Sequence, residues 1–146
     1  MKLTGTFKGQ IYNHKTNEII CWEKHNMIVS VAFDWVASLM SNTVSRPSAI
    51  THIAFGEGTT TTTYAMTTLE DEVYRARVTS AWDSATRKLT FSGSIPVNSG
   101  VEANITEVGL FTAETGGVMF DRATFSAKGV DNNTSFNYNF IITITE

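Results

Sequence analysis

The sequence holds a single cysteine, Cys21, among its 146 residues. No disulfide can therefore form within the chain, and metal sites that need two cysteines from one chain are excluded. Cys21 stands in the apolar run 19–22, where we expect a small, inert core residue. No apolar run approaches the roughly 20 residues that span a bilayer. The first ten residues lack the apolar core of a signal peptide, so we expect synthesis in a cytoplasm.

Basic residues are also scarce: 11 Lys and Arg against 14 Asp and Glu give a formal net charge of −3. A phosphate-binding surface needs a basic excess, so we expect no general attraction to nucleic acid or to an anionic membrane.

Motifs for catalysis and metal binding are missing as well. The three histidines lack metal-ligand spacing, and neither a nucleophile elbow nor a phosphate-binding loop is present. The acidic cluster 70–72 could join Asp131 at a calcium ion, but the ligand spacing favours a solvated loop. A carboxylate pair for glycoside hydrolysis is defined only in space and stays open at this point. We therefore expect no enzymatic activity, no cofactor and no metal.

The stretch 104–125 is predicted to form a β-hairpin, because two runs of β-formers flank a Gly-Gly pair that allows a tight reversal. In a symmetric register Glu107 faces Arg122 across the two strands. Apolar residues occupy both faces of the hairpin, so both should be covered, and a buried carboxylate needs a partner. We interpret Glu107 and Arg122 as a structural ion pair rather than catalytic residues, and extend this hypothesis to Glu72 and Arg75.

Alternating apolar and polar residues predict further strands, most clearly over 136–144. Turn signals recur at roughly the 8 to 12 residue spacing of all-β folds. We therefore predict a mainly β protein, an antiparallel β-sandwich or barrel of about eight strands with one α-helix. The length fits one domain over 1–146, made of an N-terminal hairpin (1–25), the helix (27–41) and a main β body (50–145).

Several connecting segments can also be predicted. A polar loop is expected at 41–48, and the glycines and threonines of 56–68 predict an exposed loop or an extended arm. One strand is expected over 72–82, with Trp82 facing inward.

The helix is predicted from apolar residues at helical spacing over 27–41, with Asn26 or Ser30 as the N-cap. It carries more large apolar side chains than one helix on a small sandwich needs, which predicts burial on more than one side. That burial could be in the core or against a neighbouring subunit. The candidate interface residues are Val29, Phe33, Trp35, Val36, Leu39 and Met40.

Three blocks of sequence carry a resemblance. Residues 26–29, NMIV, precede the predicted helix; ITHIAFGEGTT at 50–60 precedes LEDEVYR at 69–75; and ITEVGLF at 105–111 precedes FDRATF at 120–125. These blocks resemble the motifs N-x-[IV]-V, I-x-x-I-x-x-G-x-G-T-T with L-x-x-E-x-x-R, and I-x-E-x-G-L-F of virion structural proteins from tailed bacteriophages.

The resemblance implies a non-enzymatic role in building the virion, after synthesis in the host bacterial cytoplasm. It implies a homo-oligomer, with a trimer suggested by the three-fold positions that such proteins occupy. The other partners would be the major capsid protein or other virion proteins, not nucleic acid or membrane.

The place on the virion has two readings. The sequence stops directly after its final strand, whereas a tail fibre would continue into a shaft or tip, so we expect a capsid decoration or cement protein. The alternative is a small tail-fibre or baseplate component, including an adhesin. A third hypothesis concerns another class of function altogether, a carbohydrate-binding or hydrolytic β domain.

Overall fold

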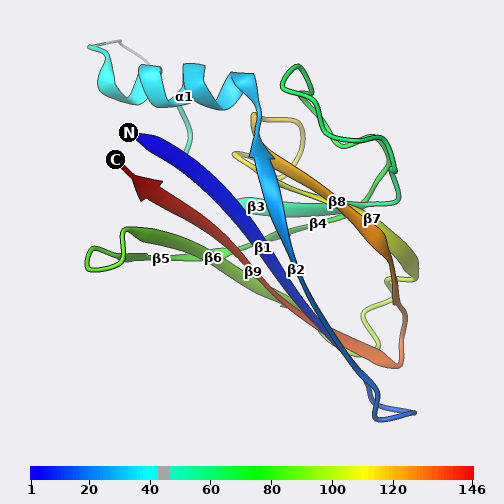
Figure 1. Cartoon of the computed structure of the whole chain (residues 1–146). Coiled ribbons are helices and arrows are strands. Elements are labelled where there is room, and N and C mark those ends of the chain that lie inside the picture. The colour runs from blue at the N-terminus through cyan, green and yellow to red at the C-terminus, as the bar shows by residue number, and fades with distance from the viewer. Residues whose placement is uncertain (43–46) are drawn as a thin grey trace.

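The computed structural model describes residues 1–42 and 47–146, which form a mainly β structure with one helix, α1, over Ser30–Met40 (Figure 1). The strands of the described residues are β1 (Lys2–Asn13), β2 (Ile19–Ile28), β3 (His52–Gly56), β4 (Glu72–Arg77), β5 (Thr79–Asp83), β6 (Lys88–Ile95), β7 (Ala103–Phe111), β8 (Met119–Val130) and β9 (Thr134–Thr145). The predicted fold class is confirmed, with nine strands where about eight were expected.

The nine strands form one nearly closed antiparallel sheet in the order β4-β3-β7-β8-β2-β1-β9-β6-β5. Two halves face each other: sheet A consists of β2, β1, β9, β6 and β5, and sheet B of β4, β3, β7 and β8. Between β2 and β8 the backbone pairing is limited to Met27 with Arg122 and Ile28 with Asp121. We call this short link the β2–β8 seam.

The two edges of the sheet, β4 and β5, are consecutive in the chain and separated only by Val78. The prediction of one strand over 72–82 is therefore wrong, because the chain passes from sheet B to sheet A at this residue. The Val78 N–H donates to the carbonyl of Thr51 over 2.9 Å, which holds the corner. Trp82 does not point into the core; it is 53% exposed, because β5 is an edge strand.

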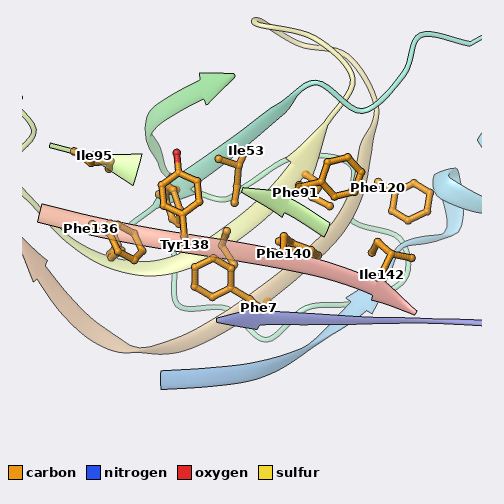
Figure 2. Close-up of a cluster of buried hydrophobic side chains, with 14 of the residues drawn as sticks. Phe7, Ile53, Phe91, Ile95, Phe120, Phe136, Tyr138, Phe140 and Ile142 are labelled. Carbon is orange, nitrogen blue, oxygen red and sulfur yellow. The ribbon is translucent and has the colours of Figure 1, made fainter. Parts of the chain in front are cut away.

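The main core lies between sheets A and B and is rich in aromatic rings from β1, β3, β6, β8 and β9 (Figure 2). Phe7 is at its centre, stacked on Phe125 and in edge contact with Phe55 and Phe140. The predicted alternation in β9 is confirmed over most of its length, since the inward series is buried at Phe136, Tyr138, Phe140 and Ile142 and half-buried at Ile144. A second, smaller cluster contains Val29, Ala54, Leu69, Phe111 and Met119.

The N-terminal hairpin is built into sheet A, because β1 pairs with β2 on one side and along its whole length with β9 on the other. Beyond the seam, β2 has a paired neighbour only in β1. Its side chains over 19–21 are consequently exposed, and the expectation that Cys21 is a core residue is wrong.

Helix α1 begins later than predicted, because Met27 and Ile28 still belong to β2 and pair with β8. Its N-cap is Val29, which has no side-chain capping bond, so the expectation of an Asn26 or Ser30 cap is wrong. The Ser30 hydroxyl instead donates to the carbonyl of Tyr64 over 2.8 Å. The polar loop expected at 41–48 includes residues 43–46, which lie outside the described residues.

Candidate functional site

Glu107 and Arg122 form an ion pair that is fully buried. Nη2 and Nε of Arg122 donate to Oε2 of Glu107 over 2.7 and 2.9 Å. The predicted register is wrong by two residues, because Gly109 lies opposite Arg122 and Thr124 lies opposite Glu107. The two side chains therefore meet diagonally, on the same face of the β7–β8 ladder. One residue of the shift arises in the turn, where Phe111 pairs with Met119 instead of Val118, and the second arises from an irregularity between Leu110 and Phe111.

The Glu107 carboxylate also anchors the loop between β3 and β4, residues 57–71. Oε1 accepts the backbone N–H groups of Gly58 (3.1 Å) and Asp71 (2.8 Å), and Oε2 accepts that of Glu70 (3.1 Å). Three amide donors and one guanidinium thus compensate a charge that has no access to water. The segment expected as an exposed loop or an extended arm is consequently a loop that is held at both of its ends.

The remaining donors of Arg122 bind the middle of the same loop. Nη1 donates to the carbonyl of Thr60 over 2.8 Å and to the hydroxyl of Thr62 over 2.9 Å. Gly58 is required at this point, because a Cβ there would crowd the Glu107 carboxylate. The pattern of glycines and threonines thus reflects a loop shaped around a buried charge pair.

The second pair, Glu72 and Arg75, links the end of the loop to the β7–β8 hairpin. Two parallel bonds of 2.6 and 2.8 Å join the guanidinium to the carboxylate. Arg75 also donates to the carbonyls of Ala113 and Gly116, and its guanidinium lies 3.8 Å from the centre of the Phe111 ring. The first ion pair thus holds the 57–71 loop in place, and the second holds the turn between β7 and β8.

The chemistry open to this centre is limited by its geometry. Every oxygen of Glu107 is occupied by a donor, and both charged side chains are sealed from solvent. Over residues 1–42 and 47–146, no group of three or more His, Cys, Asp or Glu side chains is arranged to hold a metal ion. In the acidic cluster, Glu70 accepts the N–H of Thr60, while Asp131 accepts that of Asn133.

The candidate interface residues divide into two groups. Val29 is fully buried in the second cluster, so it offers no surface to another molecule. Trp35 packs its ring edge on Phe120 and donates from Nε1 to the carbonyl of Ser48 over 2.9 Å. Val36 and Leu39 are half-buried. These four residues belong wholly or partly to the chain's own packing.

Phe33 and Met40 are the exposed members, with 53% and 75% of their surface accessible. Tyr64, on the 57–71 loop, is 62% exposed and lies beside the start of α1 through its contact with Ser30. Phe33 and Tyr64 both line an open depression of about 350 Å³, which Leu3, Met27 and Ile28 help to form. We call Phe33, Met40 and Tyr64 the α1 surface.

A different depression, of about 520 Å³, lies on the outer face of sheet A. Its polar lining consists of Lys8, Gln10, Glu23, Asn137 and Asn139. Lys8 and Glu23 form a loose exposed pair at 3.8 Å, and Asn139 accepts a hydrogen bond from Ser92 over 2.7 Å. This face therefore presents amide and hydroxyl groups with little net charge.

In comparisons with known proteins, no family model, no curated protein and no solved structure matches the chain. In the part of the chain that the structure describes, no helix has the length and apolarity needed to traverse a lipid bilayer.

Proposed function

We propose that this protein is a non-enzymatic structural component of a tailed-phage virion, a capsid decoration or cement protein that bridges capsid subunits. The observation that carries the proposal is the α1 surface, where Phe33 and Met40 of one helix and Tyr64 of the loop beside its start are exposed. Exposed apolar groups gathered in one place are typical of a protein-binding surface. The sequence resemblance described above supplies the virion as the setting.

The hydrogen bonds of the buried Glu107–Arg122 pair support the same role. They fix the 57–71 loop against sheet B, so the protein presents Tyr64 from a braced loop rather than a free arm. A rigid surface loses little conformational entropy on binding, which favours stable contacts between copies and with a shell. We infer a homo-oligomer, with a trimer as the expected form. A standard interface buries roughly 800 Å² per partner. The accessible surface of this chain is 7994 Å², so such an interface would cover about a tenth of it.

The second candidate is a tail or baseplate component that acts as an adhesin. It is favoured by the uncharged polar depression on sheet A, because the amides of Gln10, Asn137 and Asn139 can hydrogen-bond to sugar hydroxyls. A glycan site normally adds exposed aromatic side chains for stacking, whereas the aromatic residue of this lining, Trp22, packs its ring on Phe125 and Phe136. The cement role is therefore preferred.

The test combines solution mass, particle position and particle stability. The mass is measured by light scattering, a labelled protein is located on intact particles, and particles lacking the protein are heated and treated with chelator. Oligomers on the shell, with heads that break more easily in their absence, are the expected result. A monomer located at the tail, whose absence leaves heads intact but stops adsorption, would establish the adhesin instead.

A matched pair of variants links that test to the α1 surface. Phe33→Ser removes an exposed ring from α1, and Trp82→Ser removes an equally exposed ring from β5, since both residues are 53% accessible. We expect Phe33→Ser to weaken oligomers and shell binding while Trp82→Ser leaves both unchanged. Equal effects of the two substitutions would contradict the assignment of the interface to α1.

A further inference from the structure

Asp121 and Asn26 form a buried polar cluster next to the β2–β8 seam. Asp121 is fully buried, and its two oxygens form no hydrogen bond of ordinary geometry with the described residues. The same holds for the amide oxygen and nitrogen of Asn26, which are shielded from water. Buried polar atoms without partners cost free energy, so their presence calls for a physical reason.

Gly5 completes the cluster. It pairs with Asn26 in the β1–β2 ladder, and a Cβ at this position would overlap Oδ2 of Asp121. The carboxyl group therefore lies directly against the backbone of β1. Through this contact Asp121 lies where β1, β2 and β8 come together, and its own backbone forms half of the seam by pairing with Ile28.

Among the described residues, no neighbouring charge compensates the carboxyl group. Complete burial raises the pKa of Asp121 well above its usual range, and the nearby Asn26 amide opposes this effect. Arg122 is committed to Glu107, with which it is fully buried as a pair. The titratable or charged groups on the surrounding elements are Lys2, Lys8 and Tyr12 on β1, Cys21, Glu23, Lys24 and His25 on β2, Asp34 on α1, Glu57, Tyr64, Glu70 and Asp71 on the 57–71 loop, Glu107 on β7, and Arg122 and Lys128 on β8.

The surface groups among these face water. Lys8 meets Glu23 outside the sheet, and His25 meets the hydroxyl of Thr6 at 3.3 Å. Lys2, Asp34 and Tyr64 are exposed. A charge on Asp121 would therefore be stabilised only if water reached it.

We propose that Asp121 is a proton-operated latch: its protonated form keeps the β2–β8 seam closed, and loss of the proton parts β2 from β8. The seam is the shortest backbone pairing between neighbouring strands of the described residues. Two residue pairs hold it, with one further bond of 3.3 Å from the Val29 N–H to the Phe120 carbonyl, while β1 and β9 share a ladder from Lys2 to Asn13. The depression beside α1 already reaches Asn26, Met27 and Ile28 from outside. Opening the seam at these residues would let water hydrate the carboxylate.

The direction of the pH effect follows from proton linkage. The closed state binds the Asp121 proton more tightly than an opened or unfolded state, in which the carboxyl has an ordinary pKa of about 3.9. As the pH rises above that value, the opened state releases its proton first, so the closed seam loses stability. The latch is thus closed in acid and released towards alkaline pH. The proposal of a latch is argued from the fold and does not depend on the proposed function.

Hydrogen exchange tests the latch at the level of the seam. Protection factors of the amides near 27–28 and 121–122 are measured by mass spectrometry at about pH 5 and about pH 9, values that lie above the ordinary carboxyl pKa. We expect protection at the seam to fall several-fold more than protection in the β1–β9 ladder. Asp121→Asn, which mimics the protonated acid, should abolish this extra loss, whereas the surface control Asp34→Asn should retain it.

A second measurement applies to the unmodified protein, in case Asp121→Asn does not fold. The carboxyl carbon of Asp121 is followed by NMR across the same pH range, and its titration should coincide with the loss of seam protection. An Asp121 carboxyl that titrates like a surface aspartate would overturn the proposal. Seam protection that is independent of pH, or that falls equally in Asp121→Asn, would also overturn it.

Discussion

The guanidinium of Arg122 reaches the carboxylate of Glu107 along a diagonal of the β7–β8 ladder, over the residue directly opposite it, Gly109. The same carboxylate holds both ends of the 57–71 loop through Gly58 and Asp71. One buried charge pair therefore attaches a long loop to the outer side of a two-stranded hairpin. The loop in turn covers the ion pair, so each part depends on the other.

Glu107→Gln should destabilise the protein strongly, because it leaves the Arg122 charge buried without a counter-charge. Loss of one partner of a buried pair typically costs about 3 to 5 kcal/mol. Urea unfolding of the parent and the variant measures the difference. Glu23→Gln is the control, since its pair with Lys8 is exposed and 3.8 Å long, and it should change the midpoint little. A Glu107→Gln variant that unfolds like the parent would refute the structural role.

Thr62→Val should loosen the middle of the 57–71 loop while leaving both of its ends attached. The substitution removes the acceptor for Nη1 of Arg122 and retains the bond to the Thr60 carbonyl. We expect a loss of about 1 to 3 kcal/mol and faster proteolytic cleavage within the loop. Thr61→Val is the neighbouring control, because Thr61 is exposed. If both variants are cleaved at the parent rate, the hydrogen bond does not hold the loop.

Gly5→Ala should disturb the contact of β1 with Asp121, because the new Cβ would overlap the carboxylate oxygen. Overpacking of this kind costs about 1 to 3 kcal/mol. Gly129→Ala is the matched control, since its Cβ would lie 3.7 Å from the nearest atom, Oδ1 of Asn104. In an Asp121→Ala background the cost of Gly5→Ala should shrink, and thermal melts of the four proteins measure this coupling. Additive costs would show that the two residues do not interact.

Acid should weaken the protein partly through Glu70. Hydrogen bonding from Thr60 lowers the pKa of Glu70 below its ordinary value of 4.5. The stabilisation is therefore complete above about pH 4.5 and is lost as the pH falls through the lowered pKa of the folded state. Glu70→Gln should flatten this part of the stability curve, measured by urea unfolding at a series of acidic pH values. Asp34→Asn, on the exposed face of α1, should leave the curve unchanged.

Much of the β structure could be predicted because its signal is local. The alternation of β9 and the Gly-Gly turn of the β7–β8 hairpin were both readable, and Gly116 and Gly117 have the positive φ angles of 61° and 75° that were expected. The register could not be predicted, because the turn pairs Phe111 with Met119 and the irregularity between Leu110 and Phe111 adds a second residue of offset, and composition reveals neither. The Glu107–Arg122 ion pair was still predicted correctly, because an offset of two residues leaves both side chains on the same face of the ladder.

Burial at the sheet edges was harder to predict. Cys21 and Trp82 have the apolar neighbours of core residues, yet both are exposed, because β2 and β5 have one paired neighbour along those stretches. The anchored loop was missed for a related reason. Its donors are backbone N–H groups, which every residue carries, and the glycine at position 58 was the available sign of a close approach.

Strand β9 follows the other described strands in the sequence, yet it is inserted between β1 and β6 and pairs with β1 from Lys2–Thr145 to Asn13–Thr134. Half of the interior aromatic packing, including the contact of Phe7 with Phe140, therefore cannot form on the ribosome until residues near 140 have left the exit tunnel. Pairing two strands that lie far apart in the sequence also carries a loop-closure cost, which makes folding slow compared with helical proteins of this size. During synthesis β1 and β6 remain without their shared neighbour, and this nascent chain is the state in which the protein is most prone to aggregate.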